Sequence, residues 1–207
     1  DNQSVVVRGA NQDLTPADIE SERTVIEQSE IVVLQLEIPL ETVEYTLRLA
    51  KSLDKITVLN PAPARELSNN ILQLVDFLVP NEHELESMSG IAITDANSAA
   101  KAARHFLEQG VRAVIVTMGE KGCCVVEDGS VKCYRAPKVE AKDTTAAGDS
   151  FIGGFVSGYL HQRNMDAAIA QALKVAALTV TRHGAQDSLP TYEEVASFES
   201  GNSNLQK

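Results

Sequence analysis

The segment Lys142–Phe151 combines small residues with a carboxylate in an order that suits phosphate chemistry. Small side chains before a helix leave several backbone N–H groups accessible, and such groups bind anions. Asp149, in the first turn of the expected helix, could accept a proton from a hydroxyl group that attacks a phosphoryl group. It could equally cap the helix and complement its dipole. The residues alone leave both roles open.

Other polar residues follow strand-like runs, which is where ligands bind in open α/β sheets. Glu37 comes after the apolar run IVVLQL and suits a contact with a sugar hydroxyl, although it could be an ordinary loop acid. Glu84 could hold Mg²⁺ through water, but from the residues alone a solvated acid in the first turn of a helix is preferred. Gly119 and Gly122 could let the backbone approach a nucleotide or could form a plain turn.

The elements that must position these residues alternate along most of the chain. Short apolar runs predict strands over 31–36, 56–59, 76–79 and 111–117, and a β-branched run covers 5–7. Helical spacing predicts helices over 40–53, 68–74, 82–87 and 95–109. A further helix is expected to begin after Thr15, with Pro16 in its first position. This alternation indicates a mainly parallel sheet with helices on both faces, which is a three-layer αβα sandwich.

The order of elements changes after residue 122. The pair Asp128-Gly129 between two strand-like runs predicts a hairpin over 123–135. Two successive helices are expected over 147–161 and 166–181, and a last short helix over 192–198. No linker or internal repeat interrupts the pattern, so we interpret residues 1–207 as one α/β domain.

Composition excludes several classes of protein. The chain has 207 residues, 18 basic and 29 acidic, and a formal net charge of −11, which argues against a broad nucleic-acid surface. It contains no run of about 18 apolar residues and does not open with a secretory signal. The three cysteines are an odd number without a CxxC pair. We interpret them as small core or surface residues of a reducing compartment, not as a metal or redox site.

The run DTTAAGDSFIGGF, residues 143–155, resembles the C-terminal signature of the ribokinase/phosphofructokinase-B family of sugar kinases. Five further segments resemble that family in the same order: LEIPLE at 36–41, LNPAPA at 59–64, VPNEHE at 79–84, TMGEKG at 117–122 and TRHGAQ at 181–186. The resemblance covers nearly the whole chain and points to the ribokinase branch more than to fructokinase or adenosine kinase. It implies a ribokinase-like fold.

The resemblance also implies roles for particular residues. Asp149 would be the catalytic base, the backbone of Ala146, Ala147 and Gly148 would form an anion hole, and Glu37 would contact the sugar. The nucleotide would lie against Asn81, Thr117, Gly119, Lys121, Gly122 and Gly148. Glu84 would lie near Mg²⁺. A potassium site would be formed by Asp143, Thr145, Thr179, Arg182, Gly184 and Ser188, mostly through carbonyl oxygens.

The implied function is transfer of the ATP γ-phosphoryl group to the primary hydroxyl of a sugar, which is O5 of ribose in the enzymes that the chain resembles. Magnesium and potassium are the implied cofactors. Two alternatives stay open: a non-catalytic nucleotide-binding module, and a related kinase for another sugar or a nucleoside. The expected partners are small molecules and not nucleic acid or membrane, the expected location is the cytoplasm, and full-length relatives are expected to be homodimers.

Members of this family begin with a segment that the chain does not match. That segment carries the first strands, a Gly-Gly signature, sugar-gripping side chains and a lid. We therefore expect the fold to be incomplete at its N-terminus. Because catalysis requires both substrates to be positioned, we expect this chain by itself to be poorly active or inactive.

Overall fold

A computed structural model describes residues 9–198, so the predicted run at 5–7 lies outside the described residues. The chain divides into two compact units, unit 1 up to Val114 and unit 2 from Ile115 onward. The sheet has six strands in chain order, β1-β2-β3-β4-β5-β6, and β4 (Ala113–Thr117) begins in unit 1 and ends in unit 2. No helix among the described residues has the length and apolar character needed to cross a membrane.

The strands of unit 1 pair in parallel, as their apolar runs predicted. They are β1 (Ile31–Leu34), β2 (Ile56–Leu59) and β3 (Phe77–Leu78), followed by the first residues of β4. The register places Leu34 beside Leu59, and Leu59 beside Leu78. The carboxyl ends of β1, β2 and β3 therefore lie level at one edge of the sheet.

Apart from a short helix over Gly9–Asp13 that was not predicted, the helices of unit 1 follow the predicted positions with one difference. They are η1 (Gly9–Asp13), α1 (Pro16–Ser21), α2 (Arg23–Gln28), α3 (Leu40–Ser52), α4 (Asn69–Leu72), α5 (Glu82–Ser89) and α6 (Ala96–Leu107). The helix α1 begins after Thr15, as expected, and Thr15 pairs with Asp18 in a capping box. The helix breaks at Glu22, however, and continues as α2. The apolar face of α3 is buried, with Val43, Leu47 and Ala50 fully covered.

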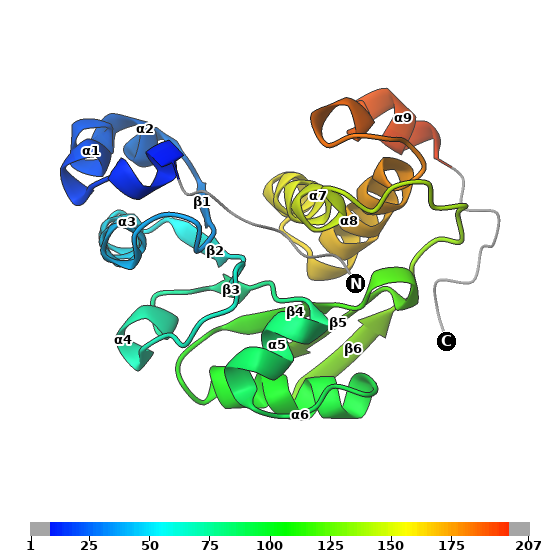
Figure 1. The fold of residues 1–207 in the computed structure, drawn as a ribbon, viewed down its shortest axis with the longest axis horizontal. Coiled ribbons are helices and arrows are strands. Elements are labelled where there is room, and N and C mark those ends of the chain that lie inside the picture. Colours follow the sequence, from blue (N-terminus) through cyan, green and yellow to red (C-terminus); the bar gives the residue numbers. More distant parts are fainter. Residues whose placement is uncertain (1–8, 199–207) are drawn as a thin grey trace. The chain divides into compact units, whose positions relative to one another are not determined.

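Unit 2 contains the predicted hairpin of β5 (Cys123–Glu127) and β6 (Ser130–Tyr134), drawn in green in Figure 1. Its two-residue turn sets Glu127 opposite Ser130, and the same register sets Cys124 opposite Cys133. These two cysteines form a disulfide, so the interpretation of all three cysteines as small core or surface residues of a reducing compartment is wrong for this pair. Cys123 points to the other face, is buried and stays a free thiol.

Two long helices and three short ones complete the described part of unit 2. The long helices α7 (Ala147–Gln162) and α8 (Met165–Thr179) lie side by side (Figure 1). Gly154 and Gly158 of α7 face α8 so closely that a Cβ on either would come within 2.9 Å of an α8 Cα atom. Shorter helices are η2 (Gly119–Lys121), η3 (Gln186–Ser188) and α9 (Tyr192–Ser197). The close α7–α8 contact fixes the direction of α7, and with it the place of its first turn.

Candidate active site

The loop before α7 has a backbone shape that the sequence alone does not reveal. Ala146 precedes the helix with φ of 58°, in the left-handed region that residues with a Cβ seldom occupy. The Ala147 amide donates to the Thr144 carbonyl at 3.2 Å, and the Ser150 amide donates to the Ala146 carbonyl at 2.9 Å. Of the three residues expected to form an anion hole, Ala147 thus uses its amide inside the loop. Gly148 is exposed, and a Cβ there would meet no atom within 4 Å.

Asp149 occupies the third position of α7 and its side chain is exposed. Two residues later, Phe151 is buried against the interior of unit 2, and Phe155 follows one turn further on. This burial anchors the first turns of α7, because rotating the helix would expose both rings to water. The carboxylate of Asp149 is therefore held at an open helix N-terminus, beside the Gly148 backbone.

Asp143 connects two segments that are distant in the sequence. Its Oδ1 accepts the Thr145 amide at 2.9 Å, and its Oδ2 accepts the Gly184 amide at 3.0 Å. A hydrogen bond from the Thr145 side chain, supported by the Gly184 and Thr145 amides, lowers the pKa of the Asp143 carboxyl to about 2. The carboxylate is thus ionised over the whole physiological range and joins the loop before α7 to the segment after α8.

The residues expected to bind potassium all belong to unit 2. Thr179 ends α8, and the others lie in these two joined segments. The Ser188 hydroxyl is buried and donates to the Ala185 carbonyl at 2.7 Å, while the Thr179 carbonyl accepts the Arg182 amide at 3.1 Å. Carboxylate, carbonyl and hydroxyl oxygens are the donors that a hard cation prefers, so the chemistry of this set fits potassium. Within residues 9–198, no three His, Cys, Asp or Glu side chains are grouped to hold a metal ion by themselves.

The two glycines of the TMGEKG segment have different surroundings. A Cβ on Gly122 would lie 1.9 Å from the Tyr134 carbonyl oxygen, so the packing of the hairpin excludes any side chain there. A Cβ on Gly119 would meet no atom within 4 Å, and its φ of 55° again favours glycine. Thr117 ends β4, and Lys121 is exposed at the end of η2. The space beside Gly119 is therefore open to a ligand, whereas the packing of the hairpin explains why residue 122 is a glycine.

In unit 1, the residues expected to contact ligands follow the strand ends. Glu37 comes three residues after β1, and Asn81 comes three residues after β3. The Asn81 side chain accepts the Glu84 amide at 2.8 Å, and Glu84 Oε2 accepts the Asn81 amide at 2.9 Å. Glu84 thus lies in the first turn of α5, as the residues alone favoured, and its carboxylate takes part in a capping box that the sequence analysis did not predict. The capping box also holds the carboxylate in one orientation.

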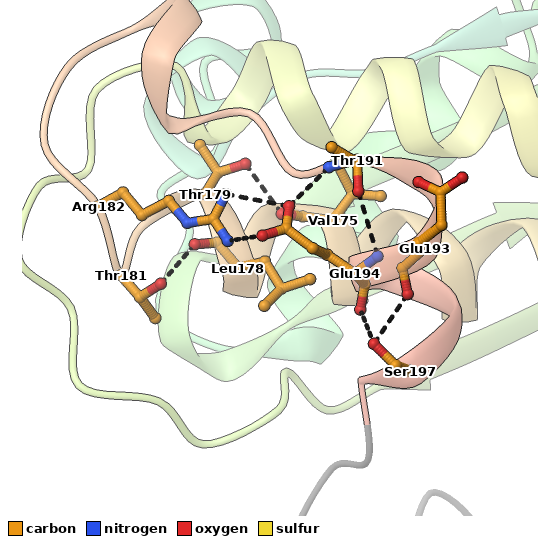
Figure 2. Close-up of polar contacts among 9 residues, drawn as sticks. All are labelled: Val175, Leu178, Thr179, Thr181, Arg182, Thr191, Glu193, Glu194 and Ser197. Carbon is orange, nitrogen blue, oxygen red and sulfur yellow. Dashed lines mark hydrogen bonds and ion pairs between the residues drawn. The ribbon is translucent and has the colours of Figure 1, made fainter.

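Two groups of interacting residues were not identified from the sequence. The Asn60 side chain accepts the Gln35 amide at 3.3 Å and donates to the Val79 carbonyl at 2.9 Å, so it ties together the ends of three strands. In unit 2, Arg182 forms an ion pair with Glu194 of α9 (Figure 2). The LNPAPA segment contains Asn60 and could have suggested the first group. No local signal predicts the second, because its members lie twelve residues apart.

Comparison with known proteins gives consistent matches over nearly the whole chain. The sequence matches the pfkB family carbohydrate kinase profile over residues 1–192. It is 41% identical to the ribokinase of Haemophilus influenzae over 198 residues, which cover 96% of this chain and 65% of that protein. It is 38% identical to the deoxyribokinase of Salmonella typhi, covering 93% of this chain and 63% of that protein. The chain thus spans a little under two thirds of the length of these relatives.

A solved structure shows the same fold. The structure of Arabidopsis thaliana ribokinase complexed with ribose and ATP matches with a TM-score of 0.89 and 25% identity, over 94% of this chain and 65% of that one. The predicted ribokinase-like α/β fold with a mainly parallel sheet is therefore confirmed. The roles of individual site residues stay predictions.

Proposed function

Because this chain belongs to the pfkB family of carbohydrate kinases, we propose that it provides the nucleotide and phosphate sites of an ATP-dependent ribokinase. The observation that carries the proposal is the start of α7. There an alanine with a left-handed backbone, an exposed glycine and an exposed aspartate follow one another at a helix N-terminus. Strained backbone of this kind occurs mostly where function requires it.

In the proposed reaction, Asp149 accepts the proton of the ribose 5-hydroxyl as that oxygen attacks the γ-phosphorus of ATP. The bond from the γ-phosphorus to the bridging oxygen breaks, and ADP leaves with the electron pair. The N-terminal dipole of α7 and the Gly148 amide stabilise negative charge on the phosphoryl oxygens. We assign the anion contact to Gly148 and the backbone around Ala146, since the Ala147 amide is used by Thr144.

The remaining contacts follow from the same family assignment. Asn81, Thr117, Gly119, Lys121 and Gly122 are proposed to border the nucleotide, with Gly119 offering the space. Glu37 is proposed to contact the sugar. Because one relative is a deoxyribokinase, 2-deoxyribose is the second candidate acceptor. We propose a cytoplasmic enzyme that is a homodimer in its full-length form.

Two cations fit the residues present. Magnesium retains several waters and needs few carboxylates, so the oriented Glu84 suffices as its protein contact. Potassium would be held by Asp143, Thr145, Thr179, Arg182, Gly184 and Ser188. When bound, these cations would supply positive charge near the transferred phosphate. The chain itself supplies the oriented carboxylates, and the Asp143 link keeps the two potassium-binding segments together.

The test is the Asp149→Asn variant, with Asp128→Asn as its matched control. Asp128 is an exposed aspartate in the β5–β6 turn of the same unit, and asparagine suits that turn equally well. In the full-length protein, we expect Asp149→Asn to lower ribose-dependent ADP release by about 10²-fold or more, because a general base contributes that much. ATP affinity measured by calorimetry should stay within about threefold of the unaltered chain, and Asp128→Asn should change neither quantity.

Equal turnover in both variants would contradict the assignment of Asp149 as the base. A full-length protein that binds ATP and transfers no phosphate to ribose would support the non-catalytic nucleotide-binding alternative. Comparing kcat/KM for ribose and 2-deoxyribose decides between the two candidate sugars.

A further inference from the structure

The loop that leads into α7 is fastened to the segment that leaves α8. The amides of Lys142 and Asp143 both donate to the Val180 carbonyl, at 2.7 and 3.2 Å. The Gly184 amide donates to Asp143 Oδ2 at 3.0 Å. The shape of the phosphate-binding loop therefore depends on where the residues after α8 are held.

Those residues are held in turn by an ion pair with α9. The Arg182 guanidinium donates to Glu194 through two nitrogens, Nη2 to Oε1 at 2.6 Å and Nη1 to Oε2 at 3.2 Å (Figure 2). Glu194 is itself fixed, because its Oε2 also accepts the Thr191 amide at 2.8 Å. Thr191 Oγ1 accepts the Glu194 amide at 3.3 Å, which completes the capping box of α9.

The position of this pair in the chain suggests a task other than general stability. The side chains of Arg182 and Glu194 are 35% and 41% exposed, and ion pairs that exposed contribute little to folding on average. The pair Arg48–Glu44 of α3 has similar exposure, but it joins residues one turn apart on the same helix. The pair Arg182–Glu194 instead closes a loop that contains Gly184, and closing a loop reduces the conformations open to the residues within it.

We propose that Arg182 and Glu194 are positioning residues that hold the Gly184 amide on Asp143, and that they thereby set the geometry of the phosphate-binding loop before α7. The effect on nucleotide rests on the function proposed above. The hold on Gly184 does not, since it concerns contacts within unit 2 alone. In this arrangement α9 acts as the outer support of the nucleotide site without touching the nucleotide.

The experiment uses Glu194→Gln, which is selective for the ion pair. Glutamine also satisfies a capping box, so the start of α9 is kept while the charge facing Arg182 is removed. The matched control is Arg48→Gln, which breaks an exposed ion pair in unit 1. The rescue variant is the reversed pair Arg182→Glu with Glu194→Arg. These changes leave every backbone carbonyl of the proposed potassium site in place.

Two readouts are compared in the full chain. Amide hydrogen exchange, which needs no ligand, should show the Gly184 and Thr145 amides exchanging faster in Glu194→Gln and unchanged in Arg48→Gln. Calorimetry with ATP and Mg²⁺ should show a dissociation constant roughly 2- to 30-fold larger in Glu194→Gln, which is the usual range for altered coupling between sites. The reversed pair should recover at least part of both effects.

The proposal is overturned if Glu194→Gln exchanges and binds like the unaltered chain, or if Arg48→Gln produces the same changes. It is also overturned if α9 amides alone exchange faster, since that would mean only a weakened helix cap. An unaltered chain that binds no ATP would contradict the proposed function, and the exchange comparison would still decide whether the pair holds Gly184.

Discussion

Gly119 and Gly122 are three positions apart in one sequence motif, but they have different physical reasons to be glycine. At Gly122 a Cβ would overlap the Tyr134 carbonyl oxygen, so folding alone requires the absence of a side chain. At Gly119 only the positive φ favours glycine, and the space above it is open.

The cysteines give a prediction at the same scale. Burial raises the pKa of the Cys123 thiol to about 12, so almost none of it is the reactive thiolate at pH 8. Cys124 and Cys133 are joined. We therefore expect iodoacetamide to label the native chain very slowly, to add one label after unfolding without reductant, and to add three after unfolding with reductant. Mass spectrometry measures the labels, and three labels without reductant would contradict the disulfide.

Helix α7 is the element on which the proposed chemistry depends, because its first turn carries Gly148 and Asp149. Its direction is set by close packing on α8. Gly154 and Gly158 make that packing possible, since each brings the two backbones nearer than a side chain would allow. The small residues that follow the motif thus have a structural task one and two turns beyond the site.

Adjacent glycines in α7 allow a controlled test of this packing. A Cβ at Gly154 would lie 2.9 Å from the Ala172 Cα and 3.0 Å from the Val175 Cβ, whereas one at Gly153 would meet nothing within 4 Å. We expect Gly154→Ala to destabilise the chain by about 1–3 kcal/mol, as overpacking does. Gly153→Ala should stabilise it by up to about 1 kcal/mol through helix propensity. Urea unfolding measures both, and equal effects would show that α7 is not tightly packed at Gly154.

At the scale of the whole molecule, the charge and the family assignment lead to the same class of partner. The chain has a net charge of −11 and belongs to the pfkB family. Its site is nevertheless expected to bind a nucleotide, which is itself a polyanion. Under the proposed function, local amides, the α7 dipole and bound cations would set the field at the phosphates, and the total charge would not. The net negative charge instead disfavours the binding of extended polyanions, because these contact a wide area of the protein surface.

We therefore expect no binding to duplex nucleic acid. Non-specific association depends on neutralising several phosphates with clustered basic residues, which this composition does not favour. Fluorescence anisotropy with a labelled 20-base-pair duplex at 50 mM salt should show no change up to about 10 µM protein. A salt-dependent rise in anisotropy within that range would show a basic surface that the net charge conceals.

Much of the fold followed from local patterns in the sequence. The apolar runs, the Thr15 capping box and the Asp128-Gly129 turn located most elements, because each depends on neighbours within a few residues. The break at Glu22 was missed, since nothing in the helical pattern marks it. The disulfide could have been found, because a two-residue turn after Glu127 sets Cys124 opposite Cys133.

By itself, the sequence determined the family and the order of most elements, because these depend on residue type and spacing. It also predicted residues for phosphoryl chemistry, and those roles stay predictions. Only the tertiary structure decided which of those residues also serve the fold. It showed that the Ala147 amide is used by Thr144, that Gly122 lies against Tyr134, and that Asp143 joins the segments before α7 and after α8. It alone revealed the Arg182–Glu194 pair, since contacts between residues far apart in the chain arise from folding and leave no local pattern.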